Sequence, residues 1–87
     1  MELDAEELEG ITADSVVDAR GSACPGPLLE AKKGMGTVSV GGVVEIRSSD
    51  AGSRGDIPVW ANKVGHEYLG VLKADEGYDR IFVRRGK

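Results

Sequence analysis

The pattern of hydrophobic and polar positions along this chain predicts six elements after a polar start. Residues 15–19 and 43–48 are short runs rich in valine and isoleucine, which is typical of strands. Residues 66–74 and 78–85 have the same character, and the glycine-containing connection 75–77 predicts that they form a hairpin. Between these runs, hydrophobic residues recur every three or four positions, which is the spacing of amphipathic helices.

The boundaries of the two helices follow from proline, aspartate and glycine. The first helix is expected to begin at Pro25, a favoured first helical residue, and to end between residues 34 and 39, where Gly34 and Gly36 weaken it. The second is expected to follow Asp56 as its N-cap and to end at Gly65. The predicted buried faces are Leu28, Ala31, Met35 and Val38 in the first helix, and Ile57, Trp60, Ala61 and Val64 in the second.

The order β-α-β-α-β-β predicts an α+β fold, a two-layer α/β sandwich with a mixed four-stranded sheet. The two helices are expected on one face of the sheet. The two β-α-β crossovers should be right-handed with parallel strands, and the last two strands should be antiparallel. The other face of the sheet is expected to be uncovered. Its candidate hydrophobic residues are Val43, Leu69 or Tyr68, and Phe82.

Charge is distributed unevenly along the 87 residues. Residues 1–14 hold six of the 15 acids and no base, so they are expected to form an acidic, flexible N-terminal arm. Residues 15–87 are expected to form the folded domain, and they hold the other nine acids and all 11 bases. The net charge of −4 therefore belongs to the arm. Without a basic run, and with only 5% aromatic residues, direct nucleic-acid binding is not expected.

Composition also narrows the location and the chemistry. The chain has no hydrophobic run long enough to span a bilayer, so a membrane partner is not expected. Its first residues lack the basic and hydrophobic character of a signal peptide, so a cytoplasmic location is expected. One cysteine and one histidine are too few ligands for a zinc site, so no metal and no cofactor are expected. A single thiol in a reducing compartment is either buried or reactive.

The single cysteine, Cys24, stands at the expected start of the first helix. The positive end of a helix favours a thiolate or a persulfide anion. Pro25 and Pro27 each remove one backbone donor, but they also make a rigid turn, and Gly26 leaves the approach to the sulfur uncluttered. This context suits a sulfur that is handed between proteins. The alternative is a small, partly buried cysteine without a chemical role.

No catalytic base is evident beside this thiol. His66 is the one histidine, and its place after Gly65 favours a helix stop or a surface position over a Cys–His dyad.

The stretch 17–27, Val-Asp-Ala-Arg-Gly-Ser-Ala-Cys-Pro-Gly-Pro, resembles the signature of the TusA/SirA (YedF-like) sulfur-carrier family. In that family a short strand, a glycine and Cys-Pro-x-Pro lead into the first helix. Further similarities follow in order at 49–50, at Asp-Ile-Pro 56–58, at Trp60 and at Gly-His-Glu 65–67. The resemblance covers about residues 15–85, and the predicted element order is also that of the family.

The resemblance implies that Cys24 accepts sulfur as a persulfide and passes it to another protein. The donor would be a cysteine desulfurase or a rhodanese-like protein. The destination would be tRNA thiolation, cofactor maturation or sulfur metabolism. By position, Pro25, Gly26 and Pro27 would shape the supporting loop. From proximity alone, and not from a motif, a basic partner-binding rim is predicted at Arg20, Lys32, Lys33 and Arg54.

Two departures and two alternatives accompany this resemblance. Ser-Asp-Ala at 49–51 stands where the family often has Asp-Asp-Pro or Asp-Pro, and the first helix contains two glycines where the family has bulkier residues. The main alternative function is a thiol-based regulatory or redox module, although no second, resolving cysteine is present. A stand-alone sulfurtransferase is disfavoured because no acid–base apparatus is evident.

Overall fold

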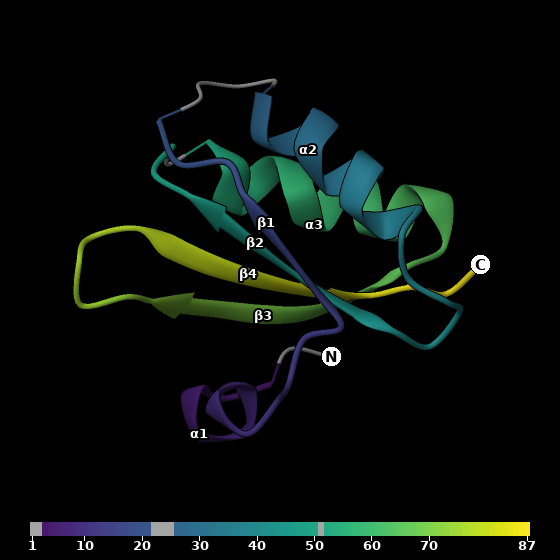
Figure 1. The fold of residues 1–87 in the computed structure, drawn as a ribbon, viewed down its shortest axis with the longest axis horizontal. Helices are drawn as coiled ribbons and strands as arrows, with labels where there is room; N and C mark the ends of the chain where they lie inside the picture. The colour runs from purple at the N-terminus through teal and green to yellow at the C-terminus, as the bar shows by residue number, and fades with distance from the viewer. Residues whose placement is uncertain (1–2, 22–25, 51) are drawn as a thin grey trace.

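The computed structural model describes residues 3–21, 26–50 and 52–87. Four strands form one mixed sheet in the order β1-β2-β4-β3 (Figure 1). β1 is parallel to β2, and β4 is antiparallel to both β2 and β3. The bounds of the strands are Ser15–Asp18 for β1, Val43–Ser48 for β2, Glu67–Lys73 for β3 and Asp79–Arg84 for β4.

The mixed sheet and the antiparallel final hairpin confirm the predicted fold class. The hairpin strand β4, however, lies between β2 and β3, so these two strands run in the same direction without being neighbours. The composition of β4 explains its central place. Ile81, Phe82 and Val83 are all 0% exposed, and a run buried on both faces needs a neighbouring layer on each side.

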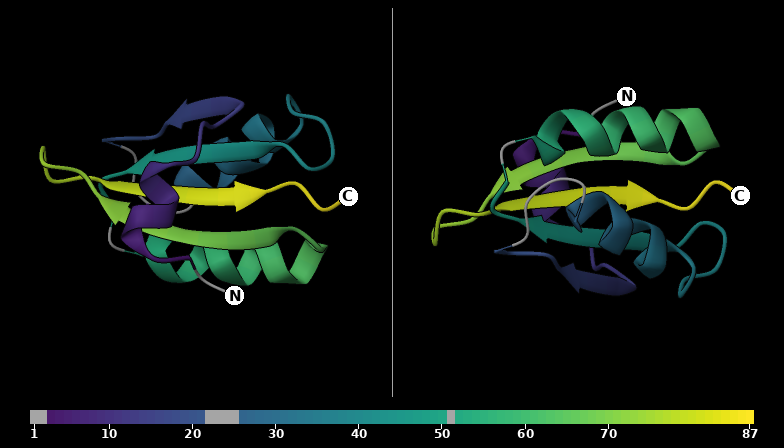
Figure 2. Two further views of the ribbon diagram at one scale, coloured as in Figure 1. Left: turned by 90° about the horizontal axis from the view of Figure 1, so that it is seen from below. Right: turned by 90° about the horizontal axis from the view of Figure 1, so that it is seen from above.

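Two helices, α2 (Gly26–Met35) and α3 (Ser53–Val64), cover one face of the sheet (Figure 2). The predicted buried faces are confirmed at most positions. Val64 is 39% exposed, Leu28 is only partly buried, and Val38 is buried but lies beyond the end of α2. Gly34 has a packing role, because a Cβ on it would overlap with Cγ2 of Val17 in β1. The main core consists of Ala31, Met35, Val38, Val44, Ile46, Ile57, Trp60, Ala61, Ile81 and Val83.

The start of α3 differs from its prediction. The helix begins at Ser53, and the N–H of Asp56 bonds to the carbonyl of Gly52, so Asp56 lies within the first turn and is not the N-cap. The Ser53 hydroxyl is buried 3.0 Å from the Ser48 hydroxyl, which fixes the first turn to the end of β2. The predicted end is confirmed, because Gly65 adopts the left-handed conformation (φ 89°) that a C-terminal cap requires.

A helix that the sequence analysis did not predict, α1 (Ala5–Glu9), packs on the opposite face of the sheet (Figures 1 and 2). The expectation of an uncovered face is therefore wrong. Leu8 is 1% exposed, and Asp4 caps the helix by accepting a bond from the N–H of Glu7. Five residues are too short for a periodic pattern, which is why the helix was missed. The second hydrophobic cluster is Leu8, Val43, Leu69, Leu72 and Phe82.

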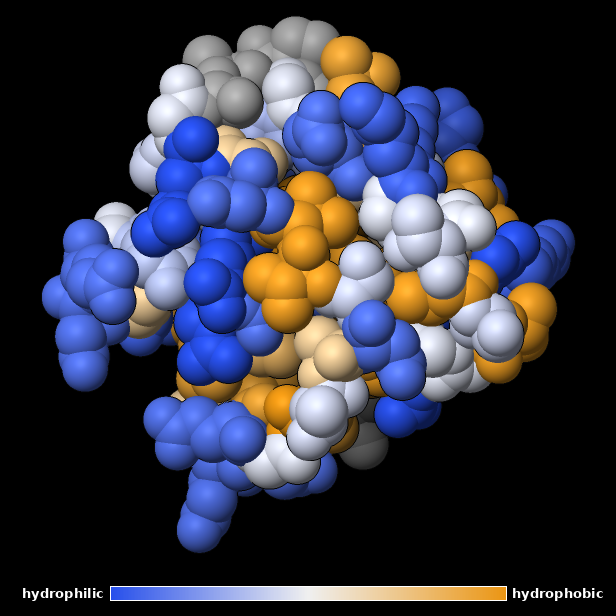
Figure 3. Space-filling model, in the orientation of Figure 1, coloured by the Kyte–Doolittle hydropathy of each residue, from blue (hydrophilic) through white to orange (hydrophobic). Residues whose placement is uncertain are grey.

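The surface seen in the orientation of Figure 1 divides into two zones. Hydrophobic side chains gather near the middle of the view, whereas hydrophilic side chains dominate the side on which the β3–β4 hairpin lies (Figure 3). Val16 of the edge strand β1 is 50% exposed. The hairpin end therefore carries polar groups suited to organise a site.

Candidate functional site

The predicted site centres on Cys24, and this residue and Pro25 lie outside the described residues. The chain is described up to Gly21 and again from Gly26. Gly26 is the first residue of α2, and Pro27 is buried within the first turn of this helix. The geometry of the site is therefore given by the two segments that flank Cys24.

The segment before Cys24 is bound to the end of β2. The N–H of Ala19 donates to the carbonyl of Arg47 (2.8 Å), and the N–H of Gly21 donates to the hydroxyl of Ser49 (2.9 Å). Gly21 has a φ of 83°, a conformation that side-chain-bearing residues rarely adopt, which accounts for glycine here. Two backbone bonds thus fix the position from which the chain leads to Cys24.

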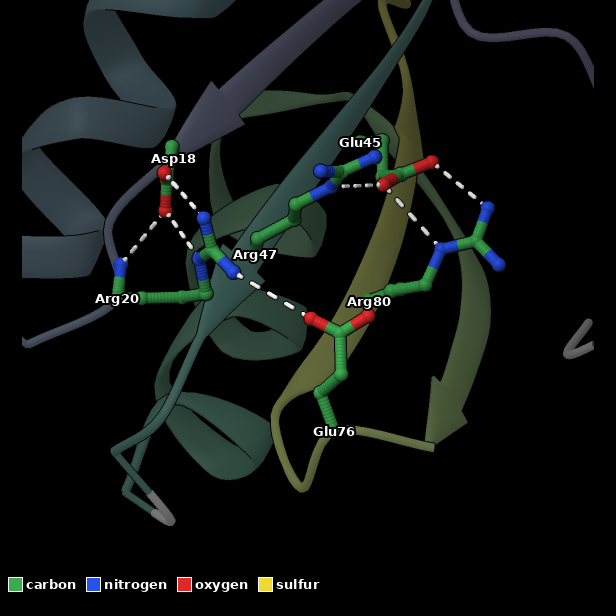
Figure 4. Close-up of polar contacts among 6 residues, drawn as sticks. All are labelled: Asp18, Arg20, Glu45, Arg47, Glu76 and Arg80. Carbon is green, nitrogen blue, oxygen red and sulfur yellow. Dashed lines mark hydrogen bonds and ion pairs between the residues drawn. The ribbon is translucent and has the colours of Figure 1, made fainter. Parts of the chain in front are cut away.

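Between these two anchors, Arg20 forms a bidentate ion pair with Asp18 (Figure 4). Both N–O distances are 2.8 Å, and the backbone N–H of Arg20 adds a third bond to the same carboxylate. These hydrogen bonds lower the pKa of Asp18 from 3.8 to about 2, and the same pairing raises the pKa of Arg20. The Arg20 guanidinium also lies 4.9 Å from the centre of the Tyr78 ring and 4.0 Å from the carboxylate of Glu76.

A second carboxylate, Glu45, lies beside this pair on the α1 face of the sheet (Figure 4). It is 4% exposed and accepts bonds from Arg47 (2.7 Å) and Arg80 (3.0 and 3.2 Å). Burial acts to raise the pKa of Glu45, but the bonds from the two arginines outweigh it, and the net pKa is lowered. Glu45 is therefore ionised and holds both arginines in place.

Of the four residues predicted to form a basic rim, three lie within ion-pair distance of a carboxylate, and the two arginines form the closest pairs. Arg20 pairs with Asp18, and Arg54 pairs with Asp79 through bonds of 2.7 and 2.8 Å, which lower the pKa of Asp79. This matching leaves less positive charge for a partner than the sequence suggested.

The two predicted lysines lie further along α2. Lys33 is 3.7 Å from Glu30, and Lys32 is about 9 Å along the helix axis from Gly26. Among the described contacts, none joins any two of the four rim residues, so the rim stays a prediction.

A cavity of about 220 Å³ opens at this end of the sheet. Ser49, which anchors Gly21, is one of its lining residues, and Arg54 and Asp79 form their ion pair there. The charges in the cavity are of both signs. Its lining is Ser48, Ser49, Arg54, Lys73, Gly77 and Asp79.

His66 lies at the opposite end of the sheet, where β3 begins. Its Nδ1 accepts a bond from the N–H of Gly86 (3.0 Å), and its ring meets the edge of Trp60 at a centroid distance of 5.4 Å. Burial, together with the charges of Arg85 and Lys87, lowers the pKa of His66. The histidine is neutral and structural in this setting, and it lies at the wrong end of the strands to face the segments that flank Cys24.

A second cavity, also of about 220 Å³, lies beside His66, and its lining includes Lys32, Arg85 and Lys87. Both covering helices end here, and the Arg85 guanidinium donates to the carbonyls of Met35 and Val38. Cations at helix C-termini complement the negative end of the helix dipole. This basic group therefore has a structural explanation.

Two searches of the described residues bear on other classes of site. No group of three or more histidine, cysteine, aspartate or glutamate side chains within 3–21, 26–50 and 52–87 is arranged to hold a metal ion. No helix in the same ranges has the length and hydrophobicity needed to cross a membrane.

Sequence reasoning missed three residues of the site: Ser49 as an anchor, Tyr78 as a ring beneath Arg20, and Glu45 as the carboxylate that holds two arginines. One signal was available. Alternation within β2 places Glu45 and Arg47 on the same face, and an unpaired acid on a buried face needs cationic partners. Arg80 could not be found in this way, because its position opposite Arg47 depends on the pairing of β2 with β4.

Comparisons with known proteins agree with the fold and show the family. The sequence model of the family described as "Sulfurtransferase TusA" matches residues 15–85. A candidate sulfur carrier protein of Archaeoglobus fulgidus is 56% identical over 72 residues, which are 83% of this chain and 97% of that protein. A sulfur carrier protein TusA of Pseudomonas savastanoi is 30% identical over 81 residues, 93% of this chain and 95% of the relative.

A solved structure shows the same architecture. The crystal structure of a SirA-like protein from Desulfitobacterium hafniense superposes with a TM-score of 0.72 at 28% identity. The match covers 84% of this chain and 99% of that chain. The architecture places the chain among small α/β sandwich proteins of the SirA-like type. The chain belongs to the TusA family.

Proposed function

We propose that this chain is a sulfur carrier and that Cys24 holds the sulfur as a persulfide. The observation that carries the proposal is the family match over residues 15–85, which includes Cys24 and both flanking segments. The anchored segment 19–21 and the helix that begins at Gly26 support it, because a helix N-terminus favours an anionic sulfur.

The transfer step is a thiol–persulfide exchange. The Cys24 thiolate attacks the outer sulfur of a donor protein's cysteine persulfide. A new S–S bond forms on Cys24 while the S–S bond of the donor breaks, and the donor cysteine leaves as a thiolate. One S–S bond breaks for each that forms, so no oxidant or reductant is consumed, and the proton on the outer sulfur moves with it. The onward step repeats the exchange. The thiolate of the acceptor attacks the outer sulfur of the Cys24 persulfide, and the Cys24 sulfur leaves as a thiolate.

The partners follow from this chemistry. A cysteine desulfurase or a rhodanese-like protein supplies the persulfide, and an acceptor protein consumes it for tRNA thiolation, cofactor maturation or sulfur metabolism. A cytoplasmic location keeps the thiol reduced between transfers.

Residues 15–87 form the carrier domain, and residues 1–14 are an accessory acidic segment. The rim of Arg20, Lys32, Lys33 and Arg54 is proposed to guide partners. Arg20, Lys33 and Arg54 would do so while paired with Asp18, Glu30 and Asp79.

Intact-mass spectrometry tests the proposal. The chain is incubated with a cysteine desulfurase and L-cysteine, and its mass is compared with that of Cys24→Ser. We expect the wild type to gain the mass of one sulfur atom, to lose it on reduction, and the variant to gain nothing. A wild type that gains no sulfur from desulfurase or rhodanese-type donors would contradict the carrier function. A chain that gains no sulfur but forms a mixed disulfide at Cys24 when oxidised glutathione is added would favour the regulatory or redox alternative.

A further inference from the structure

Arg20 stands four residues before Cys24, and its side-chain contacts come from two separate parts of the chain. Asp18, at the end of β1, holds two of its guanidinium nitrogens at 2.8 Å. The β3–β4 hairpin supplies the other two contacts, the ring of Tyr78 at 4.9 Å and the carboxylate of Glu76 at 4.0 Å. The hairpin thus contacts the chain directly before the sulfur-carrying segment, although it is more than 50 residues away in sequence.

The Tyr78 ring also contacts a second arginine. The guanidinium of Arg47 lies 5.9 Å from the ring centre, and its Nε donates to the buried carboxylate of Glu45 (2.7 Å). Glu45 also holds Arg80, which comes from the same strand that Tyr78 precedes. A guanidinium over an aromatic face is attracted by the ring quadrupole. Tyr78 therefore links Arg20 to the ionic group that Glu45 forms with Arg47 and Arg80 on β2 and β4.

These contacts contribute little to the fold. The side chains of Arg20 and Asp18 are 41% and 53% exposed, and surface ion pairs add little to folding stability. Neither residue belongs to the two hydrophobic clusters that hold the layers together. Their effect is instead local. They act on residues 19–21, whose backbone is also bonded to Arg47 and Ser49.

We propose that Arg20 and Tyr78 are positioning residues for sulfur transfer between proteins. They hold residues 19–21, which come before Cys24 in sequence, at a fixed place beside the end of β2. This inference rests on the proposed carrier function of Cys24. A protein donor approaches from one direction, so its persulfide and the Cys24 thiolate must be aligned when the two proteins meet, and small misplacements lower the rate. A small-molecule persulfide approaches from any direction and is insensitive to that alignment.

Four variants separate positioning from stability. Tyr78→Leu removes the ring, and Tyr78→Phe keeps it and serves as the matched control. Arg20→Ala removes the guanidinium, and the double variant Arg20→Ala with Tyr78→Leu tests whether the two residues act together. Thermal unfolding is measured for each variant, and we expect all four midpoints to be close to that of the wild type, because Arg20 is exposed, Tyr78 is only half-buried, and neither belongs to a hydrophobic cluster.

The first readout needs no sulfur donor. The contact between Arg20 and Tyr78 is called the Arg20 clamp here. Amide hydrogen exchange at residues 19–21 is expected to be about tenfold faster in Tyr78→Leu and Arg20→Ala, because residues 19–21 open more often without this clamp. Exchange in Tyr78→Phe is expected to be unchanged. Unchanged exchange in Tyr78→Leu and Arg20→Ala would overturn the inference whether or not the chain carries sulfur.

The second readout is the single-turnover rate of sulfur transfer to Cys24. With a cysteine desulfurase charged by L-cysteine, we expect rates about tenfold lower in Tyr78→Leu and Arg20→Ala, and no further loss in the double variant. With glutathione persulfide as donor, we expect changes of less than about twofold. Variant rates equal to wild type with the protein donor, or a loss in the double variant that is the product of the single losses, would overturn the inference. A wild type that accepts no sulfur would instead contradict the carrier function, and hydrogen exchange would still decide whether the clamp exists.

Discussion

The two faces of the sheet are built on different principles. The face under α2 and α3 is continuous hydrophobic packing, with Ala31, Ile57 and Ala61 all 0% exposed. The face under α1 is divided. One half is the hydrophobic cluster around Leu8, and the other half is the ionic group around Glu45.

The difference shows which part of the molecule maintains the fold and which part organises the site. The helical face consists of ordinary core residues and reaches the site through α2, which begins at Gly26. The ionic half of the other face extends through Arg47 and Tyr78 to Arg20, four residues before Cys24. We therefore expect substitutions under the helices to change stability most, and substitutions in the ionic half to change transfer more than stability.

The largest effect is expected at Ile81 of β4, in the core between the sheet and the helices α2 and α3. Ile81→Ala should lower the free energy of unfolding by about 3–4 kcal/mol, because it removes buried methyl groups and leaves a cavity. Urea unfolding followed by circular dichroism measures the loss. Ile81→Val is the milder control, with an expected loss of about 1 kcal/mol. Equal losses for the two variants would mean that this face is not closely packed.

Leu8 tests the α1 half of the other face. Leu8→Ala should lower the free energy of unfolding by about 2 kcal/mol, less than Ile81→Ala, because a five-residue helix can detach without unfolding the sheet. Amide exchange at residues 5–9 should rise, and sulfur loading should be unchanged. Glu6→Ala, on the exposed side of α1, is the matched control and should leave exchange as in the wild type. Stability unchanged by Leu8→Ala would show that α1 does not cover this face in solution.

Glu45 tests the ionic half. Glu45→Gln should lower the free energy of unfolding by about 1.5 kcal/mol, because two arginines lose a charged acceptor. Urea unfolding at neutral pH measures this loss. Sulfur transfer from a protein donor should fall as well, because Arg47 supports the Tyr78 ring. A variant that loses stability but transfers sulfur at the wild-type rate would separate the ionic group from the site.

The smallest effect is a dependence on pH. The pKa of Glu45 is lower in the folded protein than its ordinary value of 4.5, so its contribution to stability is present above pH 4.5 and is lost as the pH falls through the folded value. The pKa of Asp18 falls from 3.8 to about 2, which places its contribution in a more acidic range. Thermal unfolding between pH 5 and pH 2 should therefore show a shallower decline in Glu45→Gln than in the wild type. Parallel declines would contradict the ionised state of Glu45.

The sequence was sufficient to predict the sheet, the two covering helices and most of their buried faces, because hydrophobic spacing and the glycine stop at Gly65 are local signals. It was insufficient for α1, whose five residues depend on the burial of Leu8 against strands far along the chain. It also missed the start of α3, because the Ser48–Ser53 contact that fixes this turn is formed only in the folded protein.

The site was predictable only in part. Cys24 follows from its neighbours in sequence and from the family resemblance. The clamp on Arg20 does not, because it requires β4 to lie between β2 and β3, which brings Tyr78 beneath two arginines. The hairpin also brings Glu76 within 4.0 Å of Arg20, and Asp18, two residues before Arg20, forms the closer pair, so both carboxylates weaken the basic rim that the sequence position of Arg20 suggested.

The most direct test of the central claim is to locate the transferred sulfur. The chain is loaded by a cysteine desulfurase supplied with cysteine that contains heavy-isotope sulfur, separated from the donor, alkylated and digested with trypsin. The cleavage sites at Arg20 and Lys32 release Cys24 in one peptide, residues 21–32. We predict one heavy sulfur on this peptide. In a parallel sample, to which a thiol acceptor is added before alkylation, we predict that the heavy sulfur is lost. Heavy sulfur absent from this peptide, or bound there and never released to a thiol, would contradict the account of Cys24 as a sulfur carrier.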